Sequence, residues 1–149
     1  MLKNVIYLLK VKLPKETQKD IVDVAAPYIK DEDFFLAQLA LEVLIKIIEI
    51  NPTNTGIYKD SIQNCVKLTK SALIQGNTTS RLSDVFMLIG AHKLADPTML
   101  FNSLISEINK NCLATVSKAL AGLILGVDEK SKQGFIQQLI GKVRFFYFE

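Results

Sequence analysis

Apolar residues recur at steps of three and four along almost the whole chain, and no segment alternates strictly between apolar and polar residues. Steps of three and four follow the turn of an α-helix, whereas strict alternation is typical of a half-buried strand. The pattern therefore predicts an all-α protein. The expected helices cover residues 2–11, 15–29, 34–50, 57–73, 78–93, 97–108, 112–126 and 129–143.

Proline, asparagine, glycine and aspartate residues mark the expected helix ends. Pro14 and Lys15 open the second helix, and Pro27, which has no backbone N–H, should bend or end it early. The acidic run 31–33 favours the start of the next helix, because negative charge is stabilised beside unpaired backbone N–H groups. Further ends are predicted at Asn51-Pro52 and Gly76-Asn77, and further N-terminal caps at Asp96 and Asp128.

The apolar positions of each helix predict its buried face. On this basis we expect burial of Ile21, Val22, Val24, Ala25, Ile29, Ile57, Ile62, Cys65, Val66, Leu73, Leu82, Val85, Phe86, Ile89, Leu100, Phe101, Leu104, Ile105, Ile108, Phe135, Ile136, Leu139, Ile140 and Val143. The helix over 34–50 differs from the others because almost every position is apolar outside one narrow polar stripe. Such a helix is covered on most sides, as an inner helix of a stack would be.

The expected helices form pairs. The outer helix of each pair begins at Lys15, Thr55, Pro97 and Glu129, so the starts are separated by 40, 42 and 32 residues. A unit of about 40 residues is the size of HEAT or armadillo repeats. We therefore expect a right-handed α-solenoid of HEAT-like helical hairpins, with a compact helix bundle as the alternative.

The approximate repeats are 14–52, 54–94, 96–127 and 129–149, the last one truncated, in a single domain. The chain closes on the apolar run 145–148 before Glu149, although the terminal repeat of a solenoid normally has a polar outer face. The sequence is therefore interpreted as a piece of a longer solenoid.

Inner helices of a solenoid line the concave surface that holds partners. The polar stripe of the 34–50 helix and polar residues of the next two inner helices are therefore the candidate partner-binding residues. They are Gln38, Glu42, Lys46, Glu49, Arg81, Asp84 and Lys118.

Composition argues against several classes of partner. The net charge is only +3, and Arg81 and Arg144 are the only arginines, so a nucleic-acid surface is not expected. Cys65 and Cys112 lie far apart in apolar helical segments, so we expect both to be buried and unpaired. This use of cysteine is typical of a protein in a reducing compartment. No uncharged apolar stretch is long enough to cross a membrane.

The sequence also contains no recognisable pattern of catalytic residues. His92 is the only histidine, Cys65 and Cys112 have no activating neighbour in sequence, and the glycines form no nucleotide-binding motif. The acidic run 31–33 lacks the loop pattern of a calcium site. We therefore expect no enzyme activity, no metal, no cofactor and no small-molecule substrate.

Several short motifs, in order, resemble the central HEAT stretch of the cullin-associated, neddylation-dissociated (Cand) family. The similarity runs from about Leu9 to Arg144 and includes the segment 20–70. The motifs are Ala37-Gln38-Leu39-Ala40, Ile48-Glu49-Ile50-Asn51-Pro52, Ser71-Ala72-Leu73-Ile74-Gln75-Gly76, Leu82-Ser83-Asp84-Val85-Phe86, Val116-Ser117-Lys118-Ala119-Leu120-Ala121 and Phe135-Ile136-Gln137-Gln138.

The resemblance implies a scaffold segment of a long horseshoe-shaped regulator. Such regulators wrap cullin-RING ubiquitin ligase cores that lack the ubiquitin-like modifier, and they promote exchange of substrate-receptor modules without covalent chemistry. The implied partner is a cullin-RING scaffold, and the implied location is cytoplasmic and nuclear. The alternative is a HEAT-repeat segment of a nuclear transport receptor or another large protein-interaction scaffold.

Overall fold

The computed structural model describes residues 13–106, 108 and 111–148, and every regular element among them is helical. The prediction of an all-α protein is therefore confirmed. The elements are α2 (Lys15–Ala25), η1 (Ala26–Tyr28), α3 (Phe34–Ile50), η2 (Thr55–Tyr58), α4 (Lys59–Thr69), α5 (Asn77–His92), α6 (Pro97–Ser106), α7 (Leu113–Gly126) and α8 (Glu129–Phe148), where η marks a short 3₁₀ helix. The helix predicted over 2–11 lies outside the described residues.

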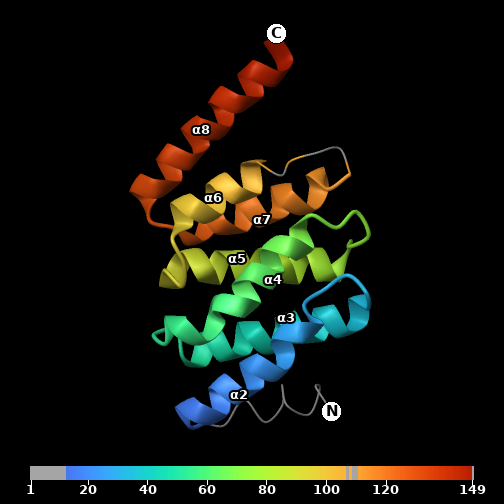
Figure 1. Ribbon diagram of the computed structural model, residues 1–149. Helices are drawn as coiled ribbons and strands as arrows, with labels where there is room; N and C mark the ends of the chain where they lie inside the picture. The colour runs from blue at the N-terminus through green and yellow to red at the C-terminus, as the bar shows by residue number, and fades with distance from the viewer. Residues whose placement is uncertain (1–12, 107, 109–110, 149) are drawn as a thin grey trace.

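The helices lie in two layers (Figure 1). In one layer α3, α5 and α7 lie side by side, and in the other α2, α4 and α6 contact one another in that order. Contacts of α2 with α3 and of α6 with α7 join the layers. The intervening helices α4 and α6 return the chain to the edge where the preceding helix of the first layer began. As a result α3, α5 and α7 all begin at the same edge, on the right of Figure 1. The last helix, α8, contacts α7, and its Phe135 ring stacks on Phe101 at 4.2 Å between ring centres.

Aspartate residues begin three of the helices as the sequence predicts. The carboxylates of Asp33, Asp96 and Asp128 accept hydrogen bonds from backbone N–H groups in the first turns of α3, α6 and α8, at 3.0, 2.8 and 3.0 Å. These bonds satisfy donors that have no partner inside the helix. The N–H of Ser131 beside the Asp128 carboxylate lowers the pKa of Asp128 below its usual value, because the bond favours the charged form.

The apolar helix α3 supplies a large part of the core. Eight of its 17 residues are buried, so it is covered on most sides as the sequence predicts. Tyr58 at the end of η2 is fully buried, and its hydroxyl donates a hydrogen bond to the backbone oxygen of Asn51 at 2.6 Å. This bond fixes the turn that follows α3.

The helices α5 and α7 approach each other far more closely than α3 and α5 do. A Cβ atom at Gly122 would overlap the backbone oxygen of Ser83, and one at Gly126 would overlap that of Met87. Glycine therefore lets the two backbones touch, and the Ser83 hydroxyl donates a hydrogen bond across the contact to the backbone oxygen of Lys118 at 2.8 Å. No glycine lies on α3, so larger side chains separate it from α5.

Some of the predicted elements and buried positions are wrong. Pro27 does end α2, as predicted, but α4 ends at Thr69 and not at Leu73. The chain leaves the helix there because Lys70 to Gln75 form the turn into α5, and Leu73 is consequently 62% exposed. Large exposed surfaces also contradict the predicted burial of Val24, Ile108, Ile136 and Ile140, whereas Val143 lies outside the described side chains.

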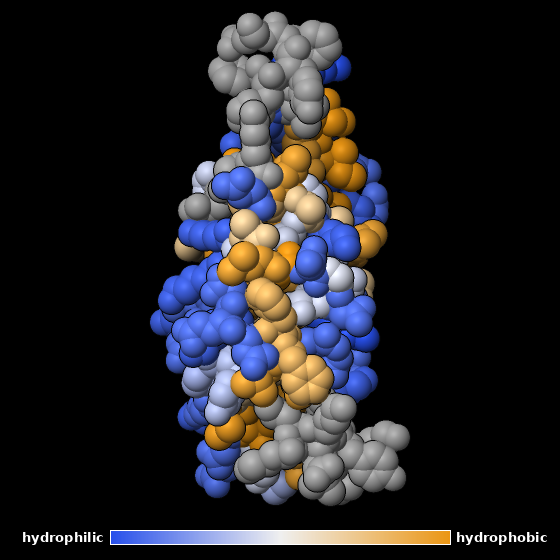
Figure 2. All heavy atoms as spheres, turned by 90° about the vertical axis from the view of Figure 1, so that its right-hand side faces the viewer, coloured by the Kyte–Doolittle hydropathy of each residue, from blue (hydrophilic) through white to orange (hydrophobic). Residues whose placement is uncertain are grey.

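Several exposed apolar side chains gather at the edge where α3, α5 and α7 begin. They are Phe34, Phe35, Leu73 and Leu113, in the first turn of α3, the loop before α5 and the first turn of α7. Figure 2, which faces this edge, shows an apolar stripe running along it between hydrophilic flanks.

Candidate functional site

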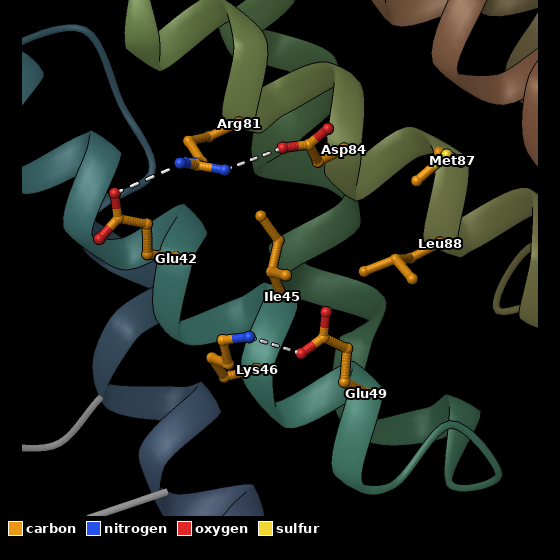
Figure 3. Close-up of a pocket in the computed structure, with 8 residues that line it drawn as sticks. All are labelled: Glu42, Ile45, Lys46, Glu49, Arg81, Asp84, Met87 and Leu88. Atoms are coloured by element: carbon orange, nitrogen blue, oxygen red, sulfur yellow. Dashed lines mark hydrogen bonds and ion pairs between the residues drawn. The ribbon is translucent and has the colours of Figure 1, made fainter. Parts of the chain in front are cut away.

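A groove with charged walls lies between α3 and α5 and holds about 430 Å³ (Figure 3). We call it the α3–α5 groove. It is lined by Glu42, Ile45, Lys46, Glu49, Arg81, Asp84, Met87 and Leu88. On α3 the other lining residues follow Glu42 by three, four and seven positions, and on α5 they follow Arg81 by three, six and seven positions. This spacing places the residues of each helix on one helical face.

Arg81 joins the two helices that form the groove. Its Nε atom lies 3.6 Å from Oε1 of Glu42 on α3, and one of its terminal nitrogens lies 3.1 Å from Oδ2 of Asp84 on α5. Glu42 also accepts a hydrogen bond from the side-chain amide of Gln38 at 3.1 Å. Three predicted site residues therefore form one ion-pair network, and Gln38 extends it along α3.

A third ion pair lies further along the groove, over an apolar floor. The ammonium of Lys46 is 2.8 Å from Oε2 of Glu49. Ile45 and Leu88 lie half-buried between this pair and the ion pairs of Arg81, and Met87 is 38% exposed beside them. Polar side chains along the walls and apolar side chains at the bottom are the arrangement found at protein-binding surfaces.

The charges of the α3–α5 groove nearly cancel. Lys46 and Arg81 contribute two positive charges, and Glu42, Glu49 and Asp84 contribute three negative charges, so the sum is −1. The side chains of these ion pairs are 28% to 51% exposed. Ion pairs this exposed contribute about 0–1 kcal/mol each, so a partner can exchange them for its own charges at little cost.

Of the seven predicted site residues, five line the groove. Gln38 contacts it only through Glu42. Lys118 lies on α7, where its backbone oxygen accepts the Ser83 bond and its side chain is exposed outside the groove. The floor residues Ile45, Met87 and Leu88 were not predicted as part of the site. Ile45 could have been, because it follows Glu42 by three positions and therefore lies on the same helical face.

The residues with reactive side chains lie outside the α3–α5 groove. His92 is exposed at the end of α5. Cys65 is fully buried, and burial raises the pKa of its thiol to about 12, which keeps it in the thiol form at neutral pH. Cys112 is also buried, as predicted. Within the described part of the chain, no group of three or more His, Cys, Asp or Glu side chains has the geometry of a metal site.

Comparisons of the chain with protein-family models, curated proteins and solved structures find no match. Over the residues that the structure covers, no helix combines the length and the apolar character needed to cross a membrane.

Proposed function

We propose that this chain is a segment of an α-solenoid of HEAT-like helical hairpins and that it binds a protein partner through the α3–α5 groove. The observation that carries the proposal is that charged residues of two neighbouring helices in one layer meet around a single hollow with an apolar floor. In helical-repeat proteins, the inner helices form the extended surface that holds partners. The starts of α2, η2, α6 and α8 coincide with the predicted starts of the outer helices, which supports the repeat interpretation.

We infer that the partner is a cullin-RING ubiquitin ligase core without its ubiquitin-like modifier. The ordered motifs that resemble the Cand family support this partner. The chain is then a non-enzymatic scaffold segment of a Cand-like regulator, in the cytoplasm and nucleus, that promotes exchange of substrate-receptor modules. It acts by competitive binding, in which one partner displaces another from the cullin, and no covalent bond changes.

Arg81 is the residue on which we expect binding to depend most. Arginine is enriched among the residues that dominate binding energy, because its planar guanidinium forms several hydrogen bonds at once. At the α3–α5 groove it already faces two carboxylates, those of Glu42 and Asp84. A partner carboxylate can replace either one and keep the guanidinium paired.

The proposal is tested by reversing the charge of Arg81 and measuring the affinity for an unmodified cullin-RING core by calorimetry. We expect Arg81→Glu to weaken binding about tenfold or more. The melting temperature should fall by no more than about 8 °C, because each kcal/mol lost with its two ion pairs lowers it by about 2–4 °C. Lys118→Glu is the matched control, because it makes the same change of charge at an exposed site on α7 outside the groove.

Equal losses from the two variants would contradict the groove as the contact site. Binding of a small GTPase or a transport cargo in place of the cullin core would overturn the inferred partner and favour a transport receptor. A loss confined to Arg81→Glu supports both the groove and the partner.

A further inference from the structure

A second groove lies in the other layer, between α4 and α6, and holds about 630 Å³. We call it the α4–α6 groove. Figure 1 shows that α4 crosses its layer obliquely. Residues of η2 and of the turn from α5 to α6 also line the groove. It is lined by Thr55, Gly56, Lys59, Ile62, Gln63, Val66, Lys67, Leu94, Ala95, Asp96, Met99, Leu100 and Ser103.

The floor of the α4–α6 groove is apolar. Ile62, Leu94 and Leu100 form its base and are at most 8% exposed. Met99 stands at the rim and is 71% exposed, more than any other large apolar side chain whose burial the structure describes. Methionine is flexible and polarisable, and exposed methionines are common on surfaces that adapt to the apolar face of a peptide.

The unpaired charges at the rim of the α4–α6 groove are positive. Lys59 and Lys67 are both exposed on α4, and neither has an ion-pair partner among the described residues. Eight residues of helix separate them by about 12 Å along the axis. Asp96 is the one acidic lining residue, and its carboxylate already accepts hydrogen bonds from the N–H groups of Thr98 and Met99.

From this arrangement we propose that the α4–α6 groove binds an acidic amphipathic helix of another protein. The apolar face of that helix packs on Ile62, Leu100 and Met99, and two acidic side chains about two helical turns apart pair with Lys59 and Lys67. This inference goes beyond the proposed function, because the groove lies in the opposite layer from the α3–α5 groove and takes a different partner segment.

The shape of the groove favours a helix over a membrane surface. Its apolar base is recessed, with Ile62, Leu94 and Leu100 at most 8% exposed, so a flat bilayer cannot reach it. Only Met99 projects, and two lysines supply little attraction to anionic lipid, at about 1 kcal/mol each. A helix with side chains three and four positions apart can enter such a groove.

The test uses a synthetic helical peptide with leucines on one face and two glutamates two helical turns apart beside them. Its control carries lysines at the two glutamate positions. Fluorescence anisotropy should give the acidic peptide a Kd on the order of 10 µM and the basic peptide an affinity about fivefold weaker. Amide chemical-shift changes on α4 and α6 locate the binding.

A variant of the protein with reversed charges separates recognition from a structural effect. In Lys59→Glu/Lys67→Glu, the preference should reverse, so that the basic peptide binds more tightly than the acidic one. Met99→Lys should weaken both peptides, and Lys118→Glu should leave both affinities unchanged. Circular dichroism checks that each variant keeps its helices.

Three results would overturn the proposal. They are equal affinity of the wild-type protein for the two peptides, chemical-shift changes confined to α3 and α5, and binding to vesicles of anionic phospholipid that the acidic peptide does not compete away. None of these results depends on whether the α3–α5 groove binds a cullin core, so the two proposals can fail separately.

Discussion

Tyr58 shows how one polar atom fixes a turn inside the core. Its ring is completely buried, and its hydroxyl reaches the backbone oxygen of Asn51, the residue that ends α3. Burial raises the pKa of this phenol from 10.0 to about 12, because the charged phenolate loses its hydration. Tyr58 was not among the positions predicted to be buried, although it precedes Ile62 by four positions and Cys65 by seven in the helix expected over 57–73.

The Tyr58→Phe variant should lower the free energy of unfolding by about 1–3 kcal/mol, because it leaves the buried oxygen of Asn51 without its donor. Urea denaturation measures the change. Tyr28→Phe is the matched control: Tyr28 is 40% exposed, so its loss should change stability by less than about 0.5 kcal/mol.

The Tyr58 hydroxyl should also make the stability of the protein depend on pH. The folded pKa of Tyr58 is raised, so its contribution to stability is complete below pH 10 and is lost as the pH rises to about 12. Wild-type stability should therefore fall more steeply across this window than that of Tyr58→Phe. Parallel curves would contradict the burial of the hydroxyl.

At the scale of the helices, small residues decide how closely neighbours approach. Gly122 and Gly126 let α7 touch the backbone of α5, whereas the charged and branched residues of α3 hold it away and leave the α3–α5 groove open. The groove is therefore a consequence of unequal spacing within one layer.

Gly122→Ala should destabilise the protein by about 1–3 kcal/mol or more, because the new methyl group must push α7 away from Ser83. Gly134→Ala is the control, since nothing lies within 4 Å of a Cβ atom at that position in α8. There the substitution should stabilise the helix by about 0.5–1 kcal/mol. Thermal unfolding compares the two, and destabilisation by Gly134→Ala alone would contradict the assigned contacts.

Helix positions could be predicted well where the sequence carries an explicit signal. The bounds of α3 match because Asp33 caps its start and Asn51-Pro52 ends it. The end of α4 was misplaced because residues 70–75 contain neither proline nor glycine, and the apolar spacing continues through Leu73. The turn there depends on the packing of α5, which local periodicity does not report.

For the whole molecule, the sequence predicted the all-helical class and the order of the helices, but it did not predict the grooves between them. Five of the seven candidate residues line the α3–α5 groove because the polar stripe of an apolar helix must lie where its covering is incomplete. Neither the close contact of α5 with α7 nor the α4–α6 groove could be predicted. Both depend on which faces of distant helices meet, and one sequence alone does not specify these pairings.

The most direct test of the central claim is a calorimetric titration of this chain with a cullin-RING core, with and without the ubiquitin-like modifier. We predict saturable binding to the unmodified core and binding at least about tenfold weaker to the modified one. Absence of binding to the unmodified core, or equal affinity for the two forms, would contradict the proposal that this chain is a segment of a Cand-like regulator.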